Sequence, residues 1–233
     1  MTAASAYILE DLRRMRRARN YFAWQSRLIR PHLGRRVIEI GCGIGNFTRE
    51  ILGCEKIVAV DSEPACVEIV AKEFPGVECF VRDIGRESIA DLARFRPDSC
   101  LFINVLEHVE NDRQAVCDAA ELLAPGGSVI IFVPAFQSLF GPIDRHLGHY
   151  RRYAPRAIRE LADAAGLRVA RLHHVNAVGF LGWWANARIF RREAQSEVQI
   201  DVFDRWIVPV MSRVETVIRP PFGQSLLAVL RKE

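Results

Sequence analysis

Lysine and long apolar runs are both scarce in this chain of 233 residues. Only Lys56, Lys72 and Lys232 are lysine among 32 cationic side chains, and arginine supplies the others. An arginine-biased codon usage accounts for most of this excess, and the alternative for a few positions is a bidentate clamp on phosphate or carboxylate. The stretch over residues 172–187 lacks Asp, Glu, Lys and Arg, but it is too short to span a bilayer.

Paired cysteines and an N-terminal apolar segment are also missing. The six cysteines include no Cys-x-x-Cys pair, which argues against a zinc site built from thiolates. Glu10 and Asp11 come early, and no apolar segment typical of a secretory signal follows them. Hydrophobic residues make up 50% and charged residues 26% of the chain, which excludes disordered, collagen-like and coiled-coil proteins. We therefore expect a folded, cytoplasmic protein with reduced cysteines.

Short β-rich runs alternate with helical patterns from residue 36 onward. The runs are mostly apolar, as expected for parallel strands that are covered on both faces. This alternation predicts a doubly wound α/β sheet with right-handed crossovers, which binds its ligands at the carboxyl ends of the strands. The expected strands are 37–40, 57–60, 77–81, 100–103, 129–133, 167–174 and 225–230, and the expected helices are 46–53, 63–73, 86–94, 111–123 and 155–165.

The remaining segments divide one domain into a core and its additions. Helical spacing over 7–30 predicts a helical cover within residues 1–35, and residues 36–178 and 222–233 form the sheet core. Residues 179–221, rich in tryptophan and phenylalanine, are expected to be a helical insertion before the last strand. The insertion could be a lid over an apolar acceptor, a homodimer surface or additional core. Membrane-surface contact is a weaker alternative, suggested by Arg188, Arg191 and Arg192.

A glycine loop joins the first expected strand to the helix that follows it. Gly41, Gly43 and Gly45 let the backbone pass close to a ligand. A dinucleotide-binding loop would carry its third glycine at the position of Asn46, where that glycine allows close packing beside a pyrophosphate. The displaced glycine therefore argues against a pyrophosphate ligand.

Acidic residues stand at the ends of the first three expected strands. Glu39 would repel a pyrophosphate but would suit a ligand that carries an ammonium or sulfonium group. Asp61 follows Gly41 at the distance where an acidic residue accepts hydrogen bonds from ribose hydroxyls. Asp83 could accept a hydrogen bond from the exocyclic amine of adenine. Three carboxylates around one glycine loop predict a nucleoside ligand with a positive charge.

This segment resembles motif I of the class I (Rossmann-like) S-adenosylmethionine-dependent methyltransferases, of the bacterial small-molecule type. The resemblance extends to Asn104–Val109 after the fourth strand and to Leu123–Gly127 before the fifth. It implies a seven-stranded sheet whose last strand, here 225–230, is antiparallel and lies between the fifth and sixth. It also implies S-adenosylmethionine as cofactor and S-adenosylhomocysteine as product. The implied cofactor-binding residues are Glu39, Gly41, Cys42, Gly43, Gly45, Asn46, Asp61, Ser62, Asp83, Ile84, Asn104 and Val105.

Methyl transfer from a sulfonium needs a general base only when the acceptor carries a proton that must leave. We expect His108, His149 and Tyr150 to be the catalytic residues. Arg151 and Arg152 could clamp an acidic group of the acceptor, and Trp183 could form part of the acceptor wall. The alternative for Arg151 and Arg152 is that they brace the helix over 155–165. The covering helix would bring Tyr21 or Trp24 near the methionine end of the cofactor.

The segment Asn104-x-x-Glu107-His108 resembles the Glu-x-x-Glu-His metal site of ubiquinone-pathway and small-RNA O-methyltransferases. Here an uncharged amide replaces the first glutamate, so we expect no functional metal.

The function that these residues predict is methyl transfer to the oxygen, nitrogen or carbon of a small, partly apolar acceptor. A net charge of +4 and the lack of an RNA-binding appendage argue against a nucleic-acid partner. The alternatives are an RNA methyltransferase, an NAD(P)-dependent oxidoreductase on the same sheet, and a non-catalytic cofactor-binding protein.

Overall fold

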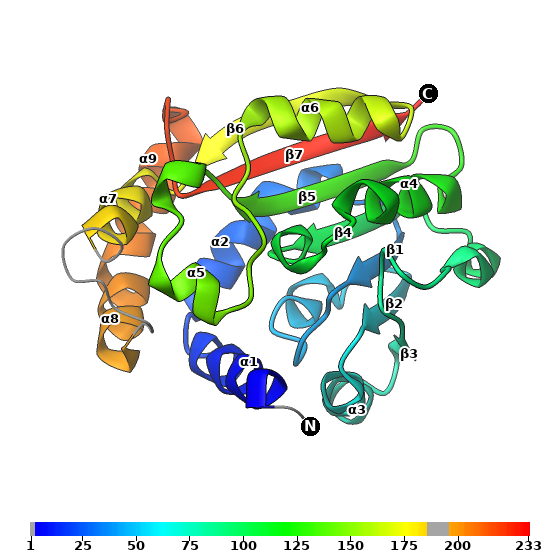
Figure 1. Ribbon diagram of the computed structural model, residues 1–233, viewed down its shortest axis with the longest axis horizontal. Helices are drawn as coiled ribbons and strands as arrows, with labels where there is room; N and C mark the ends of the chain where they lie inside the picture. Colours follow the sequence, from blue (N-terminus) through cyan, green and yellow to red (C-terminus); the bar gives the residue numbers. More distant parts are fainter. Residues whose placement is uncertain (1–2, 186–195) are drawn as a thin grey trace.

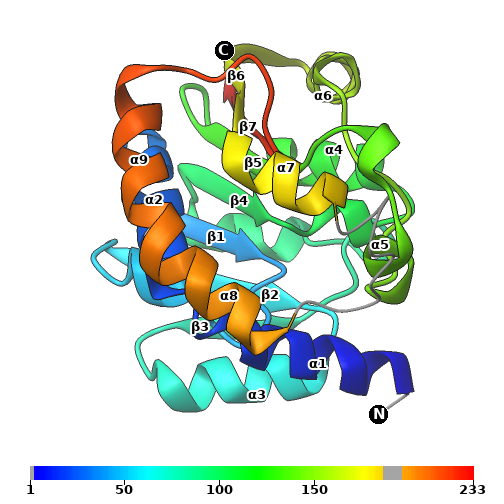
Figure 2. The ribbon, with the colours of Figure 1, turned by 90° about the vertical axis from the view of Figure 1, so that its left-hand side faces the viewer.

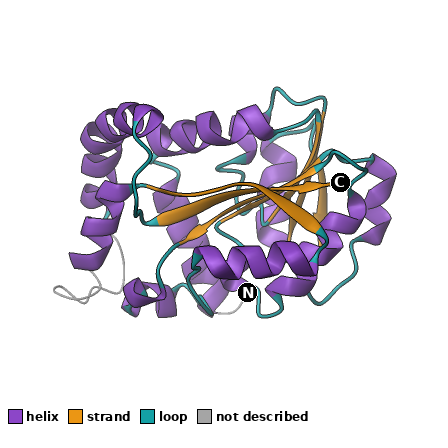
Figure 3. Cartoon of the chain, turned by 90° about the horizontal axis from the view of Figure 1, so that it is seen from above, coloured by secondary structure: helices purple, strands orange, loops and turns teal. Residues whose placement is uncertain are grey.

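A single seven-stranded sheet organises the computed structural model, which describes residues 3–185 and 196–233. The strand order is β3-β2-β1-β4-β5-β7-β6, and helices cover both faces of the sheet (Figure 1, Figure 3). β7 runs antiparallel to β5 and β6, whereas the other neighbouring strands are parallel. The expected fold is confirmed. The strands are β1 Arg36–Ile40, β2 Lys56–Asp61, β3 Glu78–Val81, β4 Ser99–Ile103, β5 Ser128–Pro134, β6 Leu167–Val175 and β7 Ser225–Lys232.

The helices between the strands differ in length from the expectation at two places. The helices expected over 46–53 and 86–94 are short 3-10 segments, η2 (Thr48–Ile51) and η3 (Ala90–Phe95). In η2 the Glu50 N–H bonds back to the carbonyl of Phe47, which is the tighter 3-10 spacing. The other connecting segments are α3 Pro64–Glu73, η4 Leu106–His108, α4 Asp112–Leu122, η5 Gln137–Leu139, α5 Pro142–His146 and α6 Pro155–Ala164.

The N-terminal cover consists of two helices, α1 (Ala3–Met15) and α2 (Arg19–Ile29), and the short 3-10 segment η1 (Arg30–His32) follows them. The prediction of a single helix over 7–30 is therefore wrong. The break has a physical cause far away in the sequence. The buried carboxylate of Asp204 accepts hydrogen bonds from the backbone N–H groups of Asn20 (3.2 Å) and Tyr21 (2.8 Å). These are orphan donors at the start of α2, so Asp204 satisfies the helix start in place of a local cap.

The segment before β7 is helical, as expected. It consists of α7 (Ala177–Ala185), α8 (Glu197–Val202), the π-helical segment η7 (Phe203–Ile207) and α9 (Val208–Val217). α8, η7 and α9 follow one another without a break; η7 and α9 lie beside α2, and α8 lies beside α1 (Figure 2). Within the described ranges no helix is long and apolar enough to cross a membrane. Arg188, Arg191 and Arg192 lie outside the described residues.

The apolar core lies on both faces of the sheet. One cluster gathers under α4 and α6 and includes Phe102 and Tyr153. The other lies under α2 and α9, where Trp24 packs edge-on against Phe132 at 6.4 Å between ring centroids. Every residue of β5 is buried. Because helices cover both faces, we expect a ligand to bind at the edge where the parallel strands end.

Removing the Asp204 carboxylate should separate α2 from the insertion. Asp204→Ala leaves two backbone donors without a partner, so we expect a loss of about 1–3 kcal/mol in the free energy of unfolding, measured by chemical denaturation. Asp201→Ala, which removes an exposed carboxylate paired with Arg17, is the matched control and should change little. Equal losses in the two variants would contradict this account of the break.

Candidate active site

The glycine loop after β1 has the geometry that a closely bound ligand requires. Gly41, Gly43 and Gly45 have φ values of 73°, 51° and 80°, a region that other residues rarely adopt. A Cβ atom on Gly41 would lie 2.3 Å from a methyl carbon of Val105. The loop is therefore pressed against the segment that follows β4. Cys42 of the loop is buried, and burial raises the pKa of its thiol.

Two carboxylates flank this loop. Glu39 is buried, accepts a 2.6 Å hydrogen bond from the Thr48 hydroxyl, and has its pKa raised to about 8 by burial. Asp61 accepts hydrogen bonds from the backbone N–H groups of Gly43 (2.8 Å) and Glu63 (2.9 Å). Burial raises the pKa of Asp61 as well, although these hydrogen bonds oppose the shift. A cation bound beside the glycine loop would stabilise both carboxylates in their charged form.

The outer end of the site is more open. Asp83 is half-buried, and its carboxylate lies 3.4 Å from a guanidinium nitrogen of Arg86. Ile84 beside it is buried and supplies an apolar wall. Ser62 precedes the start of α3. These three positions lie at the ends of β2 and β3, as expected, and only Asp83 presents a carboxylate to solvent.

The segment after β4 carries a buried carboxylic acid. Glu107 is 1% exposed, and its Oε2 atom has no hydrogen-bond partner. Burial raises the pKa of Glu107 to about 7, against the opposing charge of His149. Burial lowers the pKa of His108 to about 3, so this imidazole is neutral at ordinary pH. Asn104, at the start of this segment, has a φ of 54°, and its N–H donates to the carbonyl of Phe132 (2.7 Å).

The loop after β5 places His149 beside this segment. The Tyr150 N–H donates to the carbonyl of Glu107 (2.7 Å), which joins the two segments. The rings of His108 and His149 are perpendicular, with centroids 4.5 Å apart. His149 Nδ1 lies 2.9 Å from a carboxylate oxygen of Asp144, which is fully buried. Burial would raise the pKa of Asp144, but the hydrogen bond from His149 and the charge of Arg152 hold it below its usual value.

Arg151 and Arg152 go to different places. Arg152 is buried, donates to Asp144 (2.8 Å), and has its guanidinium 4.6 Å from the ring centroid of Trp183. Arg151 points toward the start of α4, where it contacts Asp112 (2.7 Å). Both guanidinium groups are therefore paired with carboxylates of the protein itself. Tyr150 is exposed at the rim, with 49% of its surface accessible.

α1 covers the glycine loop from the outside. Leu12 packs above Gly43, and its carbonyl accepts a hydrogen bond from the Asn46 side chain (2.9 Å). Arg16 donates to the carbonyl of Ile44 (2.8 Å). Tyr21 and Trp24 pack in the cluster under α2 and α9, which also contains Cys42 of the glycine loop. The expectation that one of them lies near the methionine end of the cofactor stays a prediction.

A metal ion has three candidate ligands in this site. Glu107, His108 and His149 each offer an atom, and these atoms lie within 4.8 Å of one another. Carboxylate and imidazole are ligands that Zn²⁺ accepts. Asn104 brings only an amide to the start of the same segment. The expectation that no metal acts here stays a prediction.

Comparisons with known proteins identify the family. A model of the methyltransferase domain matches residues 9–172, which include the glycine loop, both segments described above and the first part of β6. The chain belongs to the methyltransferase-domain family. It is 34% identical over 102 residues to a ubiquinone biosynthesis O-methyltransferase of Alkalilimnicola ehrlichii, covering 42% of this chain and 40% of that protein. The chain thus spans less than two thirds of the length of the curated relatives it matches.

Solved structures of this S-adenosylmethionine-dependent methyltransferase fold agree with the architecture. The methyltransferase in a complex with the Trm112 activator of Haloferax volcanii superposes with a TM-score of 0.65 at 17% identity, over 99% of this chain and 98% of that one. The N-methyltransferase NodS of Bradyrhizobium japonicum WM9, solved with S-adenosylhomocysteine, has a TM-score of 0.54 at 16% identity, over 96% of this chain and 87% of its own. Family membership removes the oxidoreductase alternative.

Two residues of the site escaped the sequence reasoning. The sequence pattern does not single out Asp144, yet this residue holds both His149 and Arg152. Asp11 of α1 has its pKa raised by burial and feels the charge of His149, so it faces the same site. A sequence signal existed only for Asp144, which follows Pro142 as the third residue of a short helix.

The raised pKa of Glu107 predicts how stability changes with pH. The folded protein holds this proton more tightly than the unfolded chain, so the contribution is full below about pH 4.5 and is lost as the pH rises to about 7. Glu107→Gln should therefore gain stability relative to the native protein between pH 5 and pH 8, by on the order of 3 kcal/mol at most. Urea denaturation at the two pH values measures this. A difference that does not change with pH would contradict it.

Proposed function

We propose that this methyltransferase-domain protein transfers a methyl group from S-adenosylmethionine to a small, partly apolar acceptor, and that His149 removes the acceptor's proton. The observation that carries the proposal is the cluster of Glu107, His149 and Asp144, joined to the glycine loop through the segment after β4. Glu107 and Asp144 are buried and have shifted pKa values, and buried groups of this kind are typical of an active site.

The cofactor fits the residues that are present. S-adenosylmethionine supplies an activated methyl group on a sulfonium, so the protein needs mainly to orient the two reactants. The positive φ values of the loop let its backbone take the tight turn that a nucleoside-binding loop needs, and the missing Cβ of Gly41 lets Val105 pack against it. Glu39 would hold the ammonium end and Asp61 the ribose hydroxyls, because both are acceptors at the ends of neighbouring strands. Orientation of this kind contributes about 7–11 kcal/mol in favourable cases.

His149 is suited to act as the base. Its Nδ1 faces the Asp144 carboxylate, so that Nδ1 carries the proton and Nε2 is left as the acceptor. Asp144 is in turn fixed by Arg152, whose other side lies on Trp183. Asp144, Arg152 and Trp183 are thus positioning residues, and Arg151 braces α4. His108 contributes a neutral wall beside His149, and Tyr150 stands at the rim of the site.

A hydroxyl acceptor is the version that the relatives favour. Several of the curated relatives are ubiquinone biosynthesis O-methyltransferases. A hydroxyl carries a proton that must leave during transfer, which matches a site with a built base. Nitrogen and carbon acceptors remain within the proposal, as does transfer without a metal ion. An RNA acceptor would need a basic surface that the net charge of +4 does not indicate.

Two substitutions separate cofactor binding from transfer. Asp61→Ala should weaken S-adenosylhomocysteine binding at least tenfold, by roughly the 1.5–3 kcal/mol of a hydrogen bond to a charged group, as measured by calorimetry. His149→Ala should keep this affinity and lower the release of S-adenosylhomocysteine with a panel of small phenols by about 10²-fold or more. His32→Ala, a histidine in η1 outside the site, is the control. Equal loss of affinity in the two variants would remove His149 from catalysis, and a metal chelator that abolishes turnover would contradict metal-free transfer.

The raised pKa of Glu39 predicts that cofactor binding releases a proton. Glu39 is largely protonated at pH 7 when its pKa is about 8. An ammonium group beside it favours the ionised form, so S-adenosylhomocysteine binding should release close to one proton, or about 0.9 at most. Calorimetry in two buffers of different ionisation enthalpy measures this number. Glu39→Gln should release none from this position, and an unchanged release in that variant would assign the proton to another group.

A further inference from the structure

One face of the insertion carries an apolar row that nothing in the described structure covers. Seven side chains of α8, η7 and α9 are between 49% and 83% exposed, although each is apolar. The first five recur at every fourth position, which is the spacing of one helix face. An apolar row of this length is unusual for a free surface. The residues are Val198, Val202, Trp206, Val210, Val214, Val217 and Ile218.

The π-helical segment keeps this row on one side. In an α-helix, residues four apart drift by about 40° per step, so a long row would wind around the axis. η7 lies in the middle of the row and has wider turns, with backbone bonds to the fifth residue rather than the fourth. The wider turn opposes the drift. The halves before and after η7 can therefore present their apolar side chains to the same side.

α7 extends the surface. It contains no charged residue, and Val178, Leu181 and Trp184 are 41%, 60% and 47% exposed. α7 and the rod made by α8, η7 and α9 lie on the same side of the molecule, in yellow and orange in Figure 2. Two exposed tryptophans, Trp184 and Trp206, thus stand on this side. Tryptophan is the residue that gathers where an apolar phase meets water.

The charges of the same segment are sorted by sign. Its carboxylates all bind other groups of the protein. Asp204 accepts hydrogen bonds at the start of α2, and Glu215 accepts them from the N–H groups of Asn176 (2.9 Å) and Ala177 (2.9 Å). Asp201 and Glu197 pair with Arg17. By contrast, Arg205, Arg213 and Arg219 are exposed and have no carboxylate within salt-bridge distance among the described residues. This face therefore offers apolar side chains and unneutralised cations.

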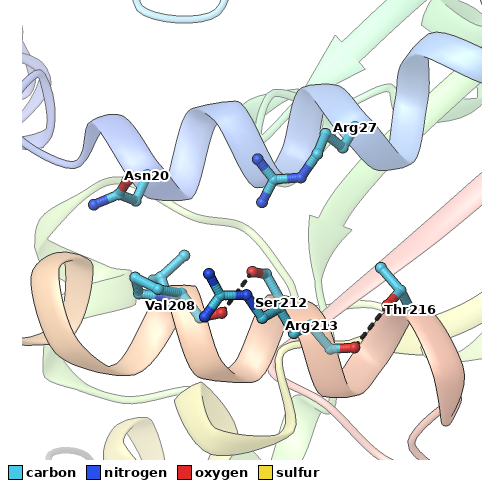
Figure 4. Close-up of a pocket in the computed structure, with 7 residues that line it drawn as sticks. Asn20, Arg27, Val208, Ser212, Arg213 and Thr216 are labelled. Atoms are coloured by element: carbon cyan, nitrogen blue, oxygen red, sulfur yellow. Dashed lines mark hydrogen bonds between the residues drawn. The ribbon is translucent and has the colours of Figure 1, made fainter.

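Two arginine side chains line a pocket beside the apolar row. It has a volume of about 390 Å³ and lies between α2 and α9 (Figure 4). Arg27 reaches from α2 toward α9, and Arg213 lines the pocket from α9 at the border of the apolar row. The hydroxyl groups of Ser212 and Thr216 are close by. Two guanidinium groups without a carboxylate in one pocket suit a phosphate.

We propose that the outward face of α7, α8, η7 and α9 binds the surface of an anionic phospholipid membrane. The apolar row enters the boundary between headgroups and acyl chains, and Arg27 and Arg213 hold a lipid phosphate. A second copy of the chain fits this face less well. Two copies meeting here would bring their arginines together without carboxylates to pair with them. The inference concerns a surface away from the glycine loop and does not depend on the transfer reaction.

Vesicle flotation tests the proposal. The full chain should bind vesicles in which about one third of the phosphatidylcholine is replaced by phosphatidylglycerol, should not bind pure phosphatidylcholine, and should dissociate as salt is raised. Val217→Asp should weaken binding roughly tenfold or more, because it places a charge on apolar surface that the membrane buries when the protein binds. Arg213→Gln should weaken it about fivefold, the equivalent of about 1 kcal/mol for one cation near the surface.

Matched controls keep the test specific. Val81→Asp makes the same exchange on the exposed side of the edge strand β3, and Arg156→Gln removes an exposed arginine of α6. Both should bind vesicles like the native protein, and circular dichroism should show all four variants folded. The proposal is overturned if anionic vesicles are not bound, or if the face variants bind as well as the controls. A concentration-dependent dimer that Val217→Asp abolishes, without vesicle binding, would assign the face to a second copy instead.

Discussion

The buried carboxylate of Asp144 has to be neutralised where it lies, and much of the site is arranged by the way the chain does this. A fully buried ion is costly unless it is paired and hydrogen-bonded. Asp144 obtains Arg152, His149 and the Gly141 N–H as partners, all within 2.9 Å. Arg152 in turn lies on Trp183 of α7. One charge therefore joins the loop after β5 to the insertion and holds His149 in place.

The pKa values of two carboxyl groups near His149 are shifted in opposite directions. Burial raises the pKa of Glu107 to about 7, whereas His149 and Arg152 overcome the effect of burial on Asp144 and keep its pKa low. Environments that separate the pKa values of neighbouring acids also separate their roles. Asp144 stays ionised and orients the imidazole. The pKa of Glu107 lies near neutral pH, so its carboxyl group can accept a proton or form a hydrogen bond with the methyl acceptor.

The glycine loop and the carboxylates beside it could be predicted because their information is local. A strand end, three glycines and an acidic residue at the next strand end lie within one βαβ unit. Arg151 and Arg152 show why the rest could not. They are chemically identical neighbours, but a β-bridge between Ala135 and Tyr153 keeps this stretch extended, so adjacent side chains point to opposite sides. Only the tertiary structure decides which arginine meets Asp144. The break before α2 depends in the same way on Asp204, far along the chain.

The inner side of the insertion connects its exposed face with the cofactor cover. Asp204 holds the start of α2, and Asp201 pairs with Arg17 in the turn between α1 and α2. α1 in turn places Leu12 above Gly43. The contact of Asp204 is buried and multiple, whereas the ion pair of Arg17 is exposed and contributes little to stability. α2 is therefore firmly attached to the insertion and α1 only weakly. The exposed face of the insertion and the cover of the glycine loop are therefore joined mainly through Asp204 and α2, whereas α1 is held mainly by its own contacts with the loop.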